Sequence, residues 1–485
     1  MKNSLAFLKL WPVCIITLGL IGCGTSTAPV VVPPAPLKPA NVNLIFVASE
    51  DLAYQAAGDI DPATANLTNQ GLQRSFLLGK YLKAKVLGSQ NVTSIYALEP
   101  MTHLQTVNHY PDMVALETVQ QFAMLNQATV PSQTGAGVTG NSYPIFASYA
   151  AGPLPDNVAQ PVFPCPGCQG LDFTDPNGVN ESLIDSVVTA NQPGFYVFSA
   201  PWEIISTLMR EVNQSQNYGL SLPTTYRGPN FVYAITIASG GTHLVTYNAN
   251  LNPSPTYPAL SLSAYAGTCT ASPFQITVTP GVSGAALPSG INTDETVYMI
   301  RHAEAHPATL WDDGNYLAAG QWRALLLPLA LRNKVQPDQV YSVDPAIGIP
   351  AVPAEGSITS SYVRPAMTVE PFAIANRLPL NLAASVPVFA QNAPDLATYA
   401  SDFFFTGGNF SNQTLLVAWE HKHIPPTLNA LFASYQSSQS APTWPDDDYD
   451  TIWRVRIDGQ GNLTVDNTLC EGIKSSSLPA TAPVF

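Results

Sequence analysis

Charged side chains are scarce in this chain, and those present are mostly acidic. Only 11% of the 485 residues are Asp, Glu, Lys or Arg, against about 25% in a typical soluble domain. Lys and Arg number 19 and Asp and Glu 33, so the formal net charge is −14. This composition argues against a nucleic-acid-binding protein, which needs a basic face. Any anion that the protein binds must be held by a few local cations against an acidic field.

A hydrophobic run long enough to span a membrane is missing at the amino terminus, where a targeting segment is predicted instead. The apolar stretch Leu10–Ile21 is shorter than the roughly 20 residues that a membrane helix needs. Leu20-Ile21-Gly22-Cys23 has the pattern of a bacterial lipobox, which predicts a signal peptide over 1–22 and a lipid on Cys23. We expect a lipid anchor in the bacterial cell envelope. The outer membrane, facing the periplasm or the surface, is favoured because Gly24 follows the cysteine where an inner-membrane retention signal typically has Asp. An ordinary secretory signal and a short anchor helix are the alternatives.

Cysteine is rare too, with six residues in the chain. Four of them would lie beyond the targeting segment in an oxidising compartment, where disulfides persist: Cys165, Cys168, Cys269 and Cys470. The turn sequence Cys165-Pro166-Gly167-Cys168 is compatible with a local bridge, which would leave Cys269 and Cys470 to join the two halves of the chain. Four cysteines allow three pairings, and a redox or zinc motif at the first two is the alternative to a bridge.

Stretches rich in proline and glycine divide the chain. Residues 23–40 contain several prolines and are expected to form an extended tether. Residues 279–293 combine prolines with glycines and are expected to link two domains. The segments 41–278 and 294–485 are therefore predicted to be the two domains.

The two predicted domains resemble each other. Asn43–Glu50 lines up with Val297–Glu304, and the helix start Asn66–Arg74 lines up with Asn315–Arg323. Later strand-like segments match in the same order, which predicts one duplicated module. The alternative is that any two doubly wound domains share such a rhythm. The alternation of strands and helices predicts an α/β fold, with two tandem three-layer α/β/α domains built on mostly parallel sheets.

The second domain carries cations and imidazoles where predicted strands end. Arg301 and His302 follow one apolar strand, His421 follows another, and Arg364 begins a helix. Open α/β sheets build their sites at the carboxyl ends of strands. The planar, charged fork of arginine suits the oxygens of a phosphoryl group, and a neutral imidazole can attack phosphorus. These residues predict phosphoryl transfer through a phosphohistidine that water then hydrolyses, and His423 competes with His421 for its place.

Arg301-His302-Ala303-Glu304 resembles the signature of the histidine phosphatase superfamily, which includes phosphoglycerate-mutase-like and acid-phosphatase-like enzymes. Other segments resemble further motifs of that family in the same order: Val340–Pro345, Arg364–Thr368 and Leu415–Pro425. By this resemblance His302 is the nucleophile. Three residues would then hold the transferred phosphoryl group: Arg301, Arg364 and His421. The insertion over 346–363, directly before Arg364, departs from the tight spacing of the family.

The acid that protonates the leaving group is less well defined by the sequence. Glu304 and Glu420 are both candidates, because Lys422 stands where some branches of the family have an aspartate. Glu304 could instead be the salt-bridge partner of a core arginine, because the first domain keeps Glu50 at the same place.

The first domain lacks the residues that would carry this chemistry. Val47 and Ala48 stand where the second domain has its Arg-His pair, and Pro201 stands where it has His421. None of these side chains can hold phosphate or attack phosphorus. We therefore expect a degenerate, catalytically silent copy with a structural role.

The sequence as a whole predicts an extracytoplasmic phosphatase acting on a small phosphomonoester without a cofactor. Its partners would be that phosphorylated substrate and a membrane, reached through the lipid anchor. A non-enzymatic, ligand-binding surface lipoprotein on the same fold is the main alternative, and a mutase is less favoured. A metal site is a further alternative, because the second domain gathers side chains of the kinds that bind zinc: His302, Glu304, His306, His421 and His423.

Overall fold

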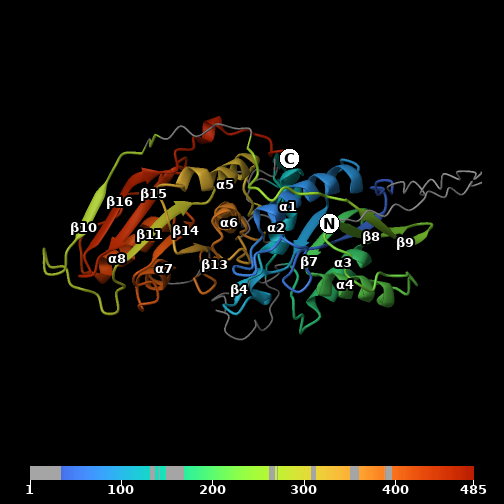
Figure 1. The fold of residues 1–485 in the computed structure, drawn as a ribbon, viewed down its shortest axis with the longest axis horizontal. Coiled ribbons are helices and arrows are strands. Elements are labelled where there is room, and N and C mark those ends of the chain that lie inside the picture. The colour runs from blue at the N-terminus through green and yellow to red at the C-terminus, as the bar shows by residue number, and fades with distance from the viewer. Residues whose placement is uncertain are drawn as a thin grey trace, which may run out of the picture. The chain divides into compact units, whose positions relative to one another are not determined.

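The computed structural model forms an α/β fold, with eight α-helices and two large sheets among the residues that it describes (Figure 1). The predicted fold class is thereby confirmed. No helix within this part of the chain is both long enough and apolar enough to cross a membrane. The described residues are 34–131, 137–140, 142–148, 169–260, 268–269, 271–306, 313–349, 360–386, 388 and 396–485.

The first half of the chain is built on a five-stranded sheet with the order β2-β7-β1-β8-β9. The central strand β1 (Val42–Ala48) is parallel to β7 (Gly194–Ala200), which is parallel to β2 (Ser94–Ala97). On its other side, β1 pairs antiparallel with β8 (Phe231–Ala238), and a tight turn leads into β9 (Gly241–Asn248). All seven residues of β1 are buried, as expected of a strand with both faces covered.

Helices cover both faces of this sheet. Along β1, Ile45 and Val47 share a hydrophobic cluster with α1 (Asn69–Tyr81) and α2 (Val114–Met124). The alternate residues Leu44 and Phe46 belong to the cluster on the opposite face, because successive side chains of a strand point to opposite faces. That cluster includes α3 (Val179–Ala190) and α4 (Trp202–Ser215). Shorter elements complete this half: η1 (Leu82–Val86), η2 (Pro100–Thr102), β3 (Leu104–Gln105), β4 (Tyr110–Pro111), β5 (Ala128–Pro131) and β6 (Gly137–Gly140).

The second half is built on a seven-stranded sheet with the order β10-β16-β15-β11-β14-β12-β13. Four strands are parallel neighbours: β11 (Glu295–Arg301), β14 (Thr414–Trp419), β12 (Gln339–Ser342) and β13 (Leu380–Leu382). Three more add antiparallel pairings: β15 (Thr451–Ile457), β16 (Leu463–Cys470) and β10 (Gln275–Val278). β10 precedes the predicted linker in sequence, yet it forms an edge of this second sheet.

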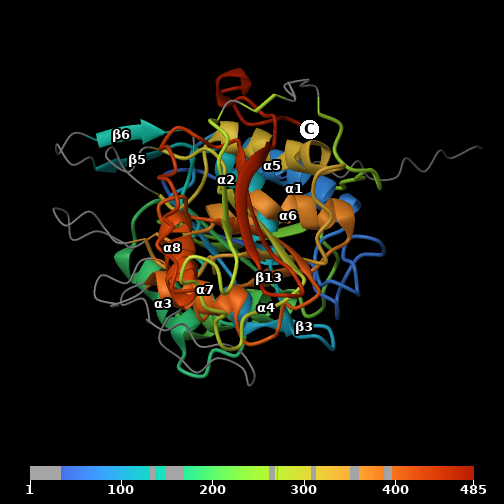
Figure 2. The ribbon, with the colours of Figure 1, turned by 90° about the vertical axis from the view of Figure 1, so that its left-hand side faces the viewer.

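Helices again lie on both faces of the second sheet (Figure 2). On one face, α5 (Ala318–Leu331) and α6 (Arg364–Asn376) contribute to the hydrophobic cluster that also contains residues of α1 and α2. On the other face, α7 (Leu396–Phe405) and α8 (Ile424–Ser434) contribute to a separate cluster. α5 continues through Pro328 for three residues, at the position where the sequence predicts a kink or an early stop. The short helix η3 (Ser475–Ser477) lies near the carboxyl terminus.

The two sheets share an order of strands. β2-β7-β1-β8-β9 corresponds to β12-β14-β11-β15-β16, and the corresponding pairs run in the same relative directions. Each sheet is mixed, whereas the sequence predicts mostly parallel sheets. β8 and β15 run antiparallel to both of their neighbours. The short connections that follow them form hairpins to β9 and β16, whereas a parallel pair needs a long crossover.

The two halves meet through α1 and α2 of the first and α5 and α6 of the second (Figure 1). One hydrophobic cluster contains residues of all four helices. Buried amides also join them: Gln120 and Asn315 exchange hydrogen bonds of 2.8 and 3.2 Å, and Gln321 donates to Gln121 at 2.6 Å. Residues 34–485 therefore pack as one unit.

The end of the predicted tether packs on the first half. Leu37 is 7% exposed, and its amide donates to the carbonyl of Val86 at 2.9 Å. The rest of the tether, the signal peptide and Cys23 lie outside the described residues.

The disulfide between Cys269 and Cys470 confirms one of the pairings that the sequence predicts. It joins the segment before β10 to the last residue of β16, with 5.4 Å between the Cα atoms. Both cysteines therefore lie at the second sheet, whereas the sequence places Cys269 in the first domain. Cys165 and Cys168, the candidates for a local bridge, lie outside the described residues.

Removing this disulfide should destabilise the folded protein. The bond closes a loop with a sequence separation of 201 residues, and it restricts the unfolded chain accordingly. We expect Cys269→Ser/Cys470→Ser to lose about 2–4 kcal/mol of unfolding free energy, measured by urea denaturation under oxidising conditions. Either single variant should lose a similar amount, because each removes the same bond. Equal stability of variant and wild type would contradict this prediction.

Candidate active site

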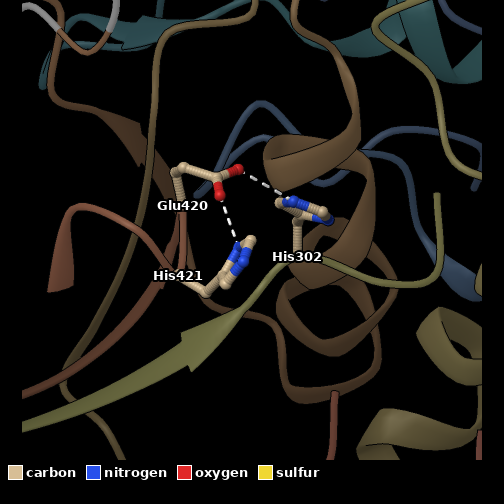
Figure 3. A group of neighbouring side chains, drawn as sticks. All are labelled: His302, Glu420 and His421. Atoms are coloured by element: carbon tan, nitrogen blue, oxygen red, sulfur yellow. Dashed lines mark hydrogen bonds and ion pairs between the residues drawn. The ribbon is translucent and has the colours of Figure 1, made fainter. Parts of the chain in front are cut away.

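Three side chains converge at the carboxyl ends of β11 and β14, two neighbouring parallel strands (Figure 3). His302 directly follows β11, and Glu420 and His421 directly follow β14. The register pairs Arg301 with Trp419, so the residues after the two strands emerge side by side. All three side chains are buried. The predicted nucleophile and the second histidine are thus brought together around one carboxylate.

Both nitrogens of the His302 ring make contacts. Nδ1 lies 2.8 Å from the carbonyl oxygen of Ala303, and a carbonyl only accepts hydrogen bonds, so Nδ1 carries a proton and donates it. Nε2 lies 3.0 Å from Oε2 of Glu420, a contact that needs a proton between the two atoms. Burial and the positive charge of Arg364 lower the pKa of His302 to about 4. The ring is therefore neutral with its proton on Nδ1, and Nε2 is the nitrogen whose lone pair can act as a nucleophile.

The Glu420 carboxylate contacts three side chains. Its Oε2 accepts a hydrogen bond from the hydroxyl of Tyr362 at 2.5 Å in addition to its contact with His302. Its Oε1 lies 2.5 Å from Nδ1 of His421. Burial, the largest influence on the pKa values of both Glu420 and His302, disfavours the charged form of each group. When the His302 ring is neutral, the single proton of this pair therefore lies on Glu420.

His421 lies between two carboxylates. Its Nδ1 faces Glu420, and its Nε2 lies 2.9 Å from Oδ1 of Asp446. The Asp446 side chain is 81% exposed, so this contact lies on the solvent side of the site. The competing histidine, His423, is the residue immediately before α8. The structure places His421, the candidate that the sequence favours, against the carboxylate of Glu420.

Two arginines lie close enough to His302 for their charges to act on its pKa. Arg301 and Arg364 are each 5% exposed. The guanidinium of Arg301 lies 3.8 Å from the ring centre of Tyr449, and that of Arg364 lies 4.6 Å from the ring centre of Tyr362. Nε of Arg301 has no hydrogen-bond partner within the described part of the chain. The structure thus brings two buried cations close to His302, and Nε of Arg301 is a donor that could bind an anion.

Helix α6 fixes the loop that follows His302. The hydroxyl of Thr368 accepts a hydrogen bond from the amide of Ala303 at 2.9 Å and donates to the carbonyl of Arg364 at 2.7 Å. The nucleophile and the second arginine are therefore held by the same turn of helix. This contact gives a physical role to the threonine that the sequence groups with Arg364.

Glu304 makes a different contact. Arg323, which is fully buried, donates to it from Nε and Nη2 at 2.8 to 3.0 Å, and also donates from Nη1 to Glu471 at 2.5 Å. The structure brings Glu304 together with an arginine of α5, which is the structural alternative that the sequence leaves open. Of the two candidate acids, Glu420 is the one that contacts the histidines.

Removing Arg323 should therefore cost stability, because two buried carboxylates would lose their partner. We expect Arg323→Met to lower the unfolding free energy by about 3–5 kcal/mol, measured by urea denaturation. The exposed Arg332, on the turn after α5, provides the matched control. Arg332→Met should change stability by less than about 0.5 kcal/mol. Similar losses in the two variants would contradict a structural role for the buried arginine.

Three site residues are not identifiable from the sequence. Tyr362 lies in the insertion before Arg364, and Asp446 and Tyr449 lie in the loop before β15. Their contacts depend on how these loops fold back over the strand ends. The local signal that could have found them is weak: an aromatic residue two positions before a candidate arginine, and an acidic loop that precedes a core strand.

The three side chains at the strand ends, those of His302, Glu420 and His421, also have the composition of a metal site. One possible ligand atom from each of His302, Glu420 and His421 lies within 4.8 Å of the others, and two imidazoles with a carboxylate are a set that zinc accepts. Arg301 and Arg364 lie beside this group, and their positive charges act on His302. Two buried guanidiniums favour an anion over a cation at the same position, so the geometry fits a phosphoryl group better than a metal ion.

Comparison with known proteins gives little. No family model and no curated protein matches the chain. Among solved structures, the chain is similar to the "putative phosphohistidine phosphatase SixA from Agrobacterium tumefaciens", with 19% identity and a TM-score of 0.19. The match covers 34% of this chain and 92% of that one. A likeness at that level does not indicate the function of this chain.

Proposed function

We propose that the second half is a phosphatase of the histidine phosphatase type, which hydrolyses a small phosphomonoester through a phosphohistidine at Nε2 of His302. One observation carries the proposal. A buried imidazole has its Nδ1 fixed as a donor to Ala303, while two buried arginines lie close enough for their charges to act on the ring. This combination prepares a nucleophile and a binding site for the negative charge that it must attack.

The substrate phosphate would be held by three side chains: Arg301, Arg364 and His421. Phosphoryl transfer depends mainly on positioning and on stabilising charge on the equatorial oxygens. The two guanidiniums supply fixed positive charge in a buried place, where electrostatic interactions are stronger than in water. Asp446 and Glu420 orient the His421 ring through its two nitrogens, so that the ring is placed before the substrate arrives.

Glu420 is the acid that we propose for the first step. Because the His302 ring is neutral, the proton between the two groups lies on Glu420, and Nε2 uses its lone pair to bond to phosphorus. The bond from phosphorus to the leaving oxygen breaks, and Glu420 gives its proton to that oxygen. In the second step, Glu420 takes a proton from water, whose oxygen attacks phosphorus and releases His302. Glu304 has no part in this scheme, because it pairs with Arg323.

The two halves are, in this proposal, tandem copies of one three-layer α/β/α domain, of which the first is catalytically silent. The matching order of their strands supports a common origin. Val47 and Ala48 end β1 at the places of Arg301 and His302. Pro201 follows β7, where the second half has its histidine.

The test of this function is an assay of the full chain, purified in detergent, with a panel of small phosphomonoesters. We expect metal-independent release of phosphate, and an acid-labile, base-stable phosphoenzyme when the reaction is quenched early. Activity that EDTA abolishes and zinc restores would instead favour a metal-dependent hydrolase at the same group. Binding of phosphate esters without turnover would favour a ligand-binding protein.

We also propose that the chain is a lipoprotein of a bacterial cell envelope, on the basis of the lipobox at Leu20-Ile21-Gly22-Cys23. Cys23→Ser should move the protein from the membrane fraction to the soluble fraction, because the acceptor of the lipid is lost. Phosphatase activity per molecule should not change. Fractionation of cells that express the two proteins provides the measurement. A variant that stays in the membrane fraction would indicate an uncleaved anchor helix.

A further inference from the structure

The carboxyl edge of the first sheet carries its own group of metal-ligand side chains. Asp51 follows β1, His103 follows η2 and Asp112 follows β4. The last two lie in the segment that connects β2 to α2, and β2 is separated from β1 only by β7. Nε2 of His103 lies 2.7 Å from Oδ2 of Asp51. One possible ligand atom from each of the three residues lies within 4.8 Å of the other two. This edge corresponds to the one where the second sheet has its candidate active site.

The carboxylate of Asp112 has an oxygen without a partner. Asp112 is fully buried, and its Oδ1 accepts a hydrogen bond from the amide of Val114 at 3.0 Å. Its Oδ2 has no hydrogen-bond partner among the described residues. The amide of Gln105 is near enough to act on the carboxyl but lies outside hydrogen-bonding geometry. A buried polar atom in this state costs free energy, and a cation bound beside it would remove that cost.

The charges around this group are opposite to those of the second half. The residues whose charges act on His103 are all acidic: Asp112, Asp51 and Glu203. At the other site, two arginines act on His302. Phosphate would be repelled at the first edge, and a cation would be attracted.

We propose that the first half binds a divalent transition-metal ion through Asp51, His103 and Asp112. Two carboxylates and one imidazole form a ligand set that zinc accepts, with bonds of about 2.0–2.2 Å. The ion would replace the hydrogen bond between His103 and Asp51. The His103 ring stacks on Phe173 with 3.6 Å between ring centres, which fixes its orientation, as ligating histidines require. This inference does not depend on the phosphatase activity of the second half.

The test is direct metal binding by the full chain. The purified protein is treated with a chelator, freed of it, and titrated with zinc chloride or manganese chloride in a calorimeter. We expect one equivalent of metal to bind. His103→Ala and the nearly isosteric Asp112→Asn should each weaken binding at least about tenfold. His302→Ala serves as the matched control, because it removes an imidazole from the other group, and it should bind metal as the wild type does.

Two results would overturn the proposal. If His302→Ala loses the ion while Asp112→Asn retains it, the metal belongs to the second half. If the wild type binds no metal, Asp51, His103 and Asp112 form only a hydrogen-bonded network. Thermal melting without metal must agree between wild type and Asp112→Asn, so that lost binding is separated from lost folding. An increase in melting temperature on adding zinc, present in wild type and absent in that variant, would support the site by a second measurement.

Discussion

His302→Ala should abolish phosphatase activity, lowering kcat by at least about 10³-fold. The imidazole supplies the nucleophile of the first step, so the phosphohistidine cannot form without it. Its Nδ1 is held by the Ala303 carbonyl and its Nε2 faces Glu420, which is the geometry that the first step uses. Initial rates with a phosphomonoester, together with a search for the acid-labile phosphoenzyme, provide the measurement.

Two other substitutions serve as controls for this prediction. His109 is exposed on the first half, so His109→Ala should leave the rate unchanged. Ala48→His, introduced into the His302→Ala protein, should restore nothing, because the first half has no arginine at the place of Arg301. A His302→Ala protein that keeps its activity would exclude the phosphohistidine mechanism.

Glu420→Gln should lower kcat in a way that depends on the leaving group. A positioned general acid contributes roughly 10²–10⁴-fold, and its contribution is needed when the departing oxygen is strongly basic. We expect a loss of that size for an alkyl phosphate and a much smaller one for p-nitrophenyl phosphate, whose leaving group departs without a proton. Rates of both substrates over a range of pH provide the comparison.

Glu304→Gln is the matched variant for this test, because Glu304 is the other acid that the sequence offers. It weakens a buried salt bridge with Arg323, so its effect should appear in the free energy of unfolding and be the same for both substrates. Equal losses for the two substrates in Glu420→Gln would assign the acid to another group. A leaving-group effect in Glu304→Gln would contradict the scheme directly.

The strand ends that carry the site could be predicted from sequence because their signal is local. An apolar run followed by Arg301 and His302 indicates a buried strand and its exit, and the run before His421 does the same. The pairing of Arg301 with Trp419 is a property of the sheet register, and no local pattern specifies it. The central place of Glu420 therefore emerges only when both strands are in position.

Other features depend on contacts between distant segments. The hydroxyl of Tyr362 reaches Glu420 across 58 positions of sequence, and Asp446 reaches His421 from the loop before β15. β10 joins the second sheet although it precedes the predicted linker. In each case the partner is selected by tertiary packing, which composition and periodicity do not report.

The buried amides between the two halves limit which parts of this protein can be lost in evolution. Four amide side chains form hydrogen bonds to one another across the boundary, and each is no more than 2% exposed: Gln120, Gln121, Asn315 and Gln321. A chain without its first half would leave the amides of Asn315 and Gln321 without their partners, either buried or exposed to water. The apolar surface of the second half that packs against the first would also be exposed. Selection for a folded second half therefore also preserves these side chains of the first half. If the first half is a silent copy, as we propose, this packing alone is enough to retain it.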